Sequence, residues 1–304
     1  MVHDARTCII VSNPASARRR SQPMVEAVAA RLQSGFDRVT LWHTEKRGDA
    51  ARLTEQLLVD SGEWPRLIVA AGGDGTVQEI AQALARAKAA GVDPCPALGI
   101  IPAGRCNDFA RALGISKDPS AVAETLLRGR CRTIDLGRVN GRYFCTIATV
   151  GIDAKITGFV DQMRIPLRGT PAYLYGTFRV LLRYAALPFR LDGDIGELQK
   201  DLFVASVANT TYYGGAIPLV PHADPTDGLL DLCMIDRIPR RRILTLLPRI
   251  LMGKHCNRPE VSFARTRQLR IETPRPCEIW ADGEHIATTP AVIDLVPGAI
   301  RVVC

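Results

Sequence analysis

The sequence has no long apolar run, no Cys-x-x-Cys pair and no nucleic-acid-binding motif. A helix needs about 20 apolar residues to span a bilayer, so we expect any contact with a membrane to be peripheral. The nine cysteines are scattered singly, which favours reduced thiols over a disulfide framework or a zinc site. The first residues lead directly into a strand-like run, so we expect no signal peptide. These absences predict a cytoplasmic protein that does not bind nucleic acid.

The composition is that of a well-packed protein with an excess of positive charge. Hydrophobic residues make up 47% of the sequence and charged residues 23%, which supports a sizeable core. A length of 304 residues is enough for two domains. The formal net charge of +8 favours anionic partners such as nucleotides and acidic lipid surfaces.

The segment Gly72-Gly73-Asp74-Gly75-Thr76 follows a short apolar run, 67–71, and precedes apolar residues at helical spacing over 77–84. The glycines therefore lie where a strand gives way to a helix, and backbone N–H groups there can point at a phosphate. The carboxylate of Asp74 suggests that Mg²⁺ or a cationic group accompanies the phosphates. On local spacing alone, the alternative is a tight turn whose glycines only allow positive φ.

Strands alternate with helices through the first part of the chain, which predicts a parallel sheet. In such sheets ligands collect at the carboxyl ends of the strands, and the loops at 13–17, 72–76 and 102–108 all lie at such ends. The predicted strands are 7–12, 38–42, 67–71 and 97–101, and the predicted helices are 22–32 and 48–59.

Beyond about residue 133 the pattern becomes mostly strand-like, with a hairpin signal at Asn140-Gly141. The predicted strands are 133–139, 143–149, 202–208, 229–235, 268–273, 277–280 and 291–303, with helices at 172–187 and 239–252. We therefore predict a Rossmann-like parallel α/β domain of residues 1–132, followed by an antiparallel β-sandwich-like domain of residues 133–304. The active site is expected in the cleft between them.

Four motifs occur in order along the chain: Asn13 to Ala17, Gly72 to Thr76 with Glu79, Asp224 to Leu229, and Asp282-Gly283-Glu284. Together they resemble the diacylglycerol kinase catalytic family, most closely the bacterial soluble lipid kinases. Two positions depart from the family pattern. Ala17 replaces a glycine, and Gly104-Arg105-Cys106 replaces Gly-Thr-Gly, so Arg105 could pair with a phosphate in place of the threonine or obstruct the pocket.

The resemblance implies a role for each group of residues. Asp282 is the implied general base, with Glu284 and Asp74 as further catalytic residues. Asp224, Asp227 and the carbonyl of Leu229 are the implied Mg²⁺ ligands. Without the resemblance, these two segments would be interpreted as a polar hairpin turn and an Asp-rich β-turn. The implied ATP-binding residues are Asn13, Pro14, Ala15, Ser16, Ala17, Thr44, Gly72, Gly73, Asp74, Gly75, Thr76, Glu79, Arg105, Asn107 and Asp108.

The function implied by the resemblance is an ATP-dependent kinase that phosphorylates a hydroxyl of a membrane lipid such as diacylglycerol. The alternatives are a kinase of another alcohol, such as a sphingoid base, another lipid or NAD, and a catalytically weakened lipid- or nucleotide-binding protein. A lipid kinase must reach a membrane, and the basic segments 164–190 and 237–254 are the candidates for contact with an anionic surface at the inner face of the membrane. A homodimer is a further expectation left open at this point.

Overall fold

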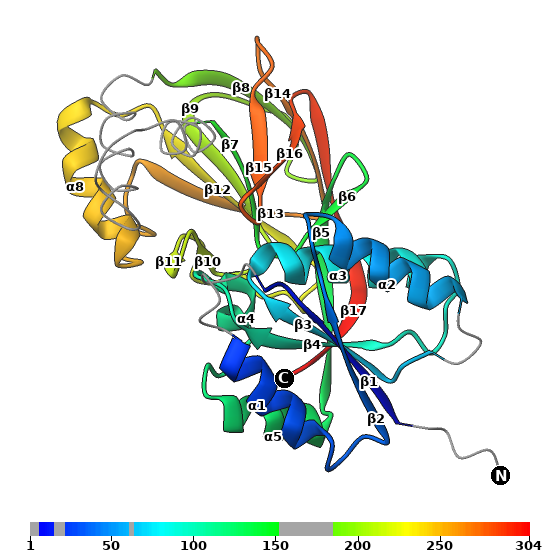
Figure 1. The fold of residues 1–304 in the computed structure, drawn as a ribbon. Coiled ribbons are helices and arrows are strands. Elements are labelled where there is room, and N and C mark those ends of the chain that lie inside the picture. The colour runs from blue at the N-terminus through cyan, green and yellow to red at the C-terminus, as the bar shows by residue number, and fades with distance from the viewer. Residues whose placement is uncertain (1–5, 15–21, 61–63, 152–184) are drawn as a thin grey trace. The chain divides into compact units, whose positions relative to one another are not determined.

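The computed structural model describes residues 6–14, 22–60, 64–151 and 185–304. The chain divides into two compact units (Figure 1). Unit 1 comprises residues 1–136, 214–216 and 296–304, and unit 2 comprises residues 137–213 and 217–295. Among the described residues, no helix is both long enough and apolar enough to cross a membrane.

Unit 1 is a parallel α/β unit in which strands and helices alternate along the chain. Its four parallel strands lie in the order β2-β1-β3-β4. β3 and β4 are buried along their whole length, as expected for strands covered on both faces. The elements are β1 (Thr7–Ser12), α1 (Gln22–Leu32), β2 (Arg38–His43), α2 (Asp49–Asp60), β3 (Leu67–Gly72), α3 (Asp74–Ala89), β4 (Ala97–Pro102), α4 (Asp108–Ala112) and α5 (Pro119–Arg128).

The helices cover the two faces of this sheet in pairs. α1 packs against α5 on one face, and α2 packs against α3 on the other (Figure 1). The first pair closes a core in which Val28 and Leu126 meet Ile10 and Val69 of the sheet. The buried residues of α1, Val25, Val28 and Leu32, recur at helical spacing on one side of the helix, as expected for a helix that covers a sheet.

Unit 2 is built around the long strand β9 (Leu198–Ala208), which pairs antiparallel with three other strands. Alternate residues of its partner β12 face two different cores: Leu232 lies in one cluster and Cys233 in the other. The remaining elements are β5 (Cys131–Val139), β6 (Arg142–Phe144), β7 (Ile147–Gly151), β8 (Leu187–Gly193), β10 (Tyr212–Tyr213), β11 (Ile217–Pro218), β12 (Leu230–Asp236), α8 (Arg240–Leu251), β13 (Val261–Thr266), β14 (Gln268–Glu272), β15 (Glu278–Ala281), β16 (Glu284–Thr288) and β17 (Ala291–Val303).

The predicted fold class is confirmed: a parallel α/β unit and an antiparallel β unit are both present. The predicted boundary at 132/133 differs from the observed division, because residues 296–304 return to unit 1. The cause is β17, whose first part pairs antiparallel with β14 while Val302 pairs parallel with Leu98 of β4. A continuous strand pattern in the sequence gives no sign of this change of partner.

Some predicted elements need correction. The helix expected over 172–187 falls largely outside the described residues, and β8 already begins at Leu187. Strands β8, β13 and β16 and helices α4 and α5 were not predicted. Several of these segments are short, and the charges on β8 and β13 obscure a two-residue alternation.

Candidate active site

The carboxyl ends of the parallel strands lie level with one another in unit 1. Ser12 is in register with both His43 and Ala71, and Gly72 is in register with Pro102. Main-chain bonds continue this alignment into the loops: Asn13 N donates to Ala71 O at 3.0 Å. The loops after β1, β2, β3 and β4 therefore leave the sheet at one edge, where ligands of such sheets bind.

The predicted site residues of these loops lie at that edge as expected from the strand register. Thr44 follows β2, and its N–H donates to Ser12 O at 2.9 Å. Asn13 and Pro14 follow β1, whereas Ala15, Ser16 and Ala17 lie outside the described residues. No ligand contact of these side chains is established by the alignment, so their nucleotide-binding roles stay predictions.

The Gly-rich turn joins β3 to α3 by main chain that packs very closely. Gly73 is the N-cap of α3, and among the described residues no side chain caps this helix. The first-turn N–H groups of a 16-residue helix thus provide an anion-binding end. A Cβ on Gly104 would lie 2.3 Å from the Cα of Gly73, and one on Gly72 would lie 2.4 Å from Thr76 Oγ1.

The glycines of this turn are required for close approach and not for positive φ. Gly72, Gly73, Gly75 and Gly104 are all absent from the described residues with positive φ. This finding removes the interpretation of a simple left-handed turn. The result is a cradle of bare main chain, of the shape that accommodates a phosphate group.

Asp74 and Glu79 both accept hydrogen bonds from the starts of neighbouring helices. Asp74 Oδ1 accepts from Phe109 N of α4 at 3.1 Å. Burial raises the pKa of the Asp74 carboxyl, and the main-chain N–H groups of α4 oppose that rise. Glu79 accepts from Gly48 N at 2.8 Å and from Ala50 N at 3.0 Å, at the start of α2. Both carboxylates therefore fix loops, and the catalytic role of Asp74 and the nucleotide contact of Glu79 stay predictions.

The loop after β4 is closed by its own side chains. Asn107, in the left-handed region with φ 55°, accepts from Gly104 N at 2.9 Å and donates through Nδ2 to Gly104 O at 2.8 Å. Asp108 accepts from Gly215 N at 2.8 Å and from Ala216 N at 2.9 Å. These two bonds join residues 214–216 to unit 1. Asn107 and Asp108 were both predicted as site residues, but their main-chain partners could not be predicted from the sequence.

Arg105 and Cys106, the two residues of this loop that depart from the family pattern, fit it without conflict. Cys106 is not among the described residues with positive φ, so its side chain imposes no strain of that kind. Its Sγ faces Gly215, where an added Cβ would lie 3.4 Å away. Arg105 is exposed, and no carboxylate of the described residues forms an ion pair with it. Its guanidinium is thus available to an anion.

Asp282 lies in unit 2, in the hairpin turn between β15 and β16. Asp282 and Gly283 have φ values of 53° and 81°, as a two-residue type I′ turn requires. The Asp282 carboxylate accepts from Cys145 N at 2.7 Å, from Thr146 N at 2.8 Å and from Thr146 Oγ1 at 2.5 Å. The hairpin interpretation is therefore right about the backbone, and it leaves a carboxylate held in a fixed orientation. Glu284 is paired with Ala281 where the hairpin closes.

Asn209, the residue that follows β9, supports the same segment. Its Nδ2 donates to Cys145 O at 2.9 Å, and its N–H donates to Thr146 O at 2.8 Å. Asn209 thus positions the two residues that hold Asp282. Cys145 and Thr146 act mostly through main-chain groups, which every non-proline residue carries.

The predicted Mg²⁺ ligands lie in a turn before β12. Asp224 Oδ1 accepts from Thr226 N at 3.0 Å, and Asp227 Oδ1 accepts from Leu229 N at 3.0 Å. Arg265 Nη1 lies 3.6 Å from Asp227 Oδ2. The oxygen ligands are of the kind Mg²⁺ prefers, but the turn is stabilised without an ion. Within the described residues, no group of three or more His, Cys, Asp or Glu is arranged to hold a metal, so this site stays a prediction.

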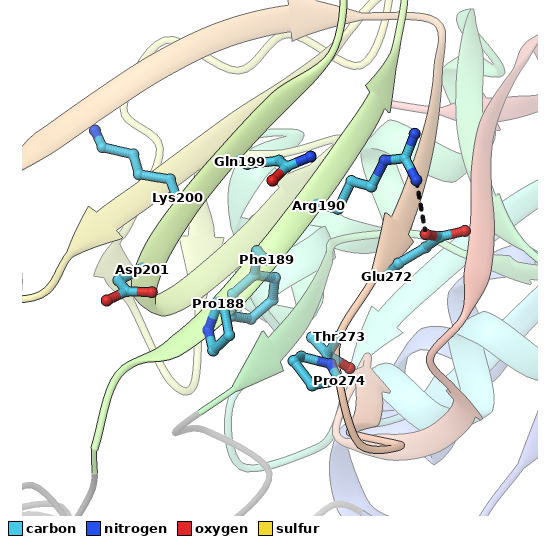
Figure 2. A pocket seen from close by; sticks show the side chains of 9 residues that line it. All are labelled: Pro188, Phe189, Arg190, Gln199, Lys200, Asp201, Glu272, Thr273 and Pro274. Atoms are coloured by element: carbon cyan, nitrogen blue, oxygen red, sulfur yellow. Dashed lines mark ion pairs between the residues drawn. The ribbon is translucent and has the colours of Figure 1, made fainter.

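Unit 2 also has a surface hollow of about 500 Å³ over β8, β9 and β14. Figure 2 shows its side chains, with Arg190 directed at Glu272 across a distance of 3.9 Å. Arg190 also pairs with Glu197 at 2.9 Å. None of the predicted site residues lines this hollow, and its paired charges are typical of a solvated sheet face.

A parallel sheet that presents uncapped main-chain N–H groups at its strand ends belongs to the class of folds that bind nucleotide phosphates. Comparison with known proteins identifies the family within this class. Residues 7–139 match the family described as the diacylglycerol kinase catalytic domain, and residues 146–304 match the YegS C-terminal NAD kinase beta sandwich-like domain.

Individual proteins agree with these matches over nearly the whole chain. A diacylglycerol kinase of Mycobacterium tuberculosis is 36% identical, with 99% of this chain and 96% of the relative covered. A probable lipid kinase YegS-like protein of Pseudomonas aeruginosa is 34% identical, with 91% and 87% covered. A crystal structure of a diacylglycerol kinase from Bacillus anthracis has a TM-score of 0.75 at 22% identity, with 98% and 97% covered, and this likeness concerns the fold.

The chain belongs to the diacylglycerol kinase family. It is a lipid kinase, and therefore a phosphotransferase that uses an alcohol group as acceptor. The predicted family and the predicted class of enzyme are thereby confirmed.

Proposed function

We propose that this chain transfers the γ-phosphate of ATP to a hydroxyl group of a membrane lipid of the diacylglycerol type. The observation that carries the proposal is the uncapped start of α3 at Gly73, packed main chain to main chain against Gly104. This end of the helix favours negative charge and lets phosphate oxygens approach the backbone closely. The relatives named diacylglycerol kinase support the choice of acceptor.

Unit 1 supplies the nucleotide side of the reaction in this proposal. The first-turn N–H groups of α3 bind phosphate oxygens, and the exposed guanidinium of Arg105 adds a cation with a forked pair of donors. Mg²⁺ bound with ATP would neutralise charge on the transferred phosphoryl group. Asp74 Oδ1 already accepts from Phe109 N, so we assign no step to a metal held there.

Unit 2 supplies the group that removes the proton from the acceptor. The carboxylate of Asp282 accepts the proton as the hydroxyl oxygen attacks the γ-phosphorus and ADP leaves. Its orientation is fixed by Cys145 and Thr146, so it does not have to be ordered during the reaction. Such preorganisation is what phosphoryl transfer asks of the protein.

The test is phosphate transfer from radiolabelled ATP with Mg²⁺ to separate acceptors: diacylglycerol, a sphingoid base and NAD. We expect labelled product with diacylglycerol, and an Asp282→Asn variant slower by about 10²–10⁴-fold. Product with the sphingoid base or NAD alone would replace the proposed acceptor. No product with any acceptor, together with measurable nucleotide binding, would favour the binding-protein alternative.

A further inference from the structure

Helix α8 ends in two neighbouring apolar side chains that face solvent. Leu251 is 36% exposed and Met252 is 58% exposed. Among the described residues, the other large hydrophobic side chains exposed to this degree are Val59 and Leu127, and each of these stands alone in the sequence. We call Leu251 and Met252 the α8 tip. Isolated exposed apolar residues need no explanation, whereas an adjacent pair is a candidate contact surface.

The tip is held rigidly by the turn that ends the helix. Gly253 N donates to Ile250 O at 3.0 Å, and Lys254 N donates to Arg249 O at 2.7 Å. With Gly253 at φ 68°, these two bonds define a Schellman motif. Glycine is needed there because the left-handed conformation is strained for other residues.

Arg249 and Lys254 occupy the C3 and C″ positions of this Schellman motif, and Arg249 Nη1 donates to Thr245 O one turn earlier in the helix. The positions that these two residues occupy usually hold an apolar pair in contact. Here both are cations, and no carboxylate of the described residues forms an ion pair with either of them. Lys254 is exposed and Arg249 is half-buried, next to the exposed apolar side chains of the tip. A surface that is apolar in its interior and anionic at its boundary would bind both kinds of group.

The opposite side of α8 is anchored in unit 2. Leu246 is buried and Ile250 packs beside it against the same apolar cluster. After the helix, His255 is fully buried, with Nε2 2.9 Å from Leu219 O. The tip therefore projects from a fixed base, and its exposure does not follow from a loosely packed helix.

The chain segment around the tip carries an excess of positive charge. Residues 237–258 contain seven Lys and Arg and no Asp or Glu. Arg241 and Lys254 are exposed, and basic residues near an anionic membrane surface are attracted to it. Two of the seven basic residues form ion pairs with carboxylates outside this segment: Arg242 with Glu260 and Arg237 with Asp201.

We propose that the α8 tip inserts into the surface of an anionic bilayer, with Leu251 and Met252 among the acyl chains and Arg249 and Lys254 at the lipid phosphates. The proposal rests on the proposed function in that a membrane lipid is the substrate. Binding to the membrane itself needs neither ATP nor turnover, so it is measured apart from the reaction.

The first experiment is sedimentation of the full chain with vesicles, without nucleotide. The vesicles contain either equal parts of phosphatidylglycerol and phosphatidylcholine or phosphatidylcholine alone. We expect the double variant Leu251→Ser/Met252→Ser to bind anionic vesicles about tenfold or more weakly than the parent. Arg249→Gln/Lys254→Gln should lose about fivefold per cation removed, and only on anionic vesicles.

The matched control is Arg86→Gln/Arg128→Gln, which removes the same charge from exposed positions of unit 1. We expect the control to bind nearly as well as the parent. Thermal melting of each variant should stay close to that of the parent, because the substituted side chains are exposed except Arg249, which is half-buried and donates to Thr245 O. Binding of the tip variants equal to that of the parent would overturn the proposal, as would a parent that does not bind anionic vesicles.

A second measurement locates the tip directly. In Met252→Trp, lipids brominated on their acyl chains should quench a part of the fluorescence that they do not quench in the parent. Absence of this additional quenching while the variant sediments with vesicles would place the contact elsewhere and overturn the proposal. If the tryptophan emission of this variant shifts with protein concentration in the absence of vesicles, the tip is buried against a second copy of the chain. That result would also overturn the proposal. If the parent binds anionic vesicles but transfers no phosphate to a lipid, that result would instead contradict the proposed function.

Discussion

Asp282 has two structural roles. Its backbone forms part of a hairpin turn, and its carboxylate accepts three hydrogen bonds from residues 145 and 146. In Asp282→Asn, an amide N–H₂ would face donors at Cys145 or Thr146. We therefore expect the variant to lose not only turnover but also about 1–3 kcal/mol of folding free energy. Urea unfolding followed by circular dichroism measures this loss.

Thr146→Val is the control for this prediction, because it removes only the hydroxyl bond to Asp282 Oδ1. The two main-chain hydrogen bonds to the Asp282 carboxylate, from Cys145 N and Thr146 N, remain in place. We therefore expect a smaller loss of turnover than in Asp282→Asn. Equal turnover losses in the two variants would contradict the assignment of proton acceptance to Asp282.

Arg105 is expected to contact a phosphate of ATP. Its exposed guanidinium has no carboxylate partner in the described part of the chain, and a hydrogen bond to a charged group is worth about 1.5–3 kcal/mol. Arg105→Ala should therefore weaken ATP binding about tenfold or more, and Arg105→Thr should partly restore it. Isothermal titration with ATP and Mg²⁺ measures both affinities. Tighter binding in both variants would show that the arginine obstructs the pocket.

Sequence alone identified the side chains of the candidate site better than their partners. Asp282, Asn107 and Asp108 belong to motifs, and the structure places each in a defined hydrogen-bonded position. Their partners are mainly main-chain N–H groups, which every non-proline residue carries. Which N–H groups meet a given carboxylate depends on long-range packing. A motif does not contain this information.

The turn that contains Asp224 and Asp227 can be tested both for its stability and for Mg²⁺ binding. Replacing both with Ala removes the acceptors for Thr226 N and Leu229 N, so the melting temperature should fall with or without Mg²⁺. If the turn also holds Mg²⁺, the parent should melt at a higher temperature as Mg²⁺ is added and the variant should not. Equal shifts in both proteins would place the ion elsewhere.

The segment after α8 should make stability depend on pH through His255. Burial lowers the pKa of His255, and its bond to Leu219 O opposes that change. Below about pH 6.5 the unfolded chain binds a proton that the folded chain resists, so the free energy of unfolding falls until the pH reaches the folded pKa. Melting temperatures between about pH 7 and pH 5 should decline less steeply in His255→Gln. Parallel declines would contradict this assignment.

Regular elements were predicted where apolar residues follow one period, and missed where the period is broken. The limits of β1 and α1 agree with the predicted 7–12 and 22–32. β8 was missed because Pro188, Arg190 and Asp192 alternate with its buried residues in a segment that contains both proline and charge. Its position next to β9 depends on pairing across the sheet, which local patterns do not encode.

The chain as a whole is joined by strands that serve both units. β5 and β17 each run from one unit into the other. Residues 296–304 give unit 1 four buried apolar side chains: Ala299, Ile300, Val302 and Val303. Burying each valine or isoleucine contributes about 1.5–3 kcal/mol, so the sum is comparable with a typical net stability of about 5–15 kcal/mol.

A chain that stops at Leu295 should therefore fail to form a stable unit 1, although all of its parallel strands β1 to β4 are present. We expect a marked loss of protection from proteolysis within residues 22–128, measured by mass spectrometry of the fragments. The milder variant Val302→Ala should keep the fold and melt at a lower temperature. Protection of the shortened chain equal to that of the parent would contradict this role of β17.

The return of β17 to β4 also orders events during synthesis on the ribosome. Residues 1–136 emerge first, but β4 lacks its outer neighbour until residues 137–295 have been made. At about 5–20 residues per second, this delay is on the order of ten to thirty seconds. During that time the nascent chain exposes an unpaired strand edge, the feature from which proteins aggregate and to which chaperones bind. The first unit to be translated is thus the one that must wait to be completed.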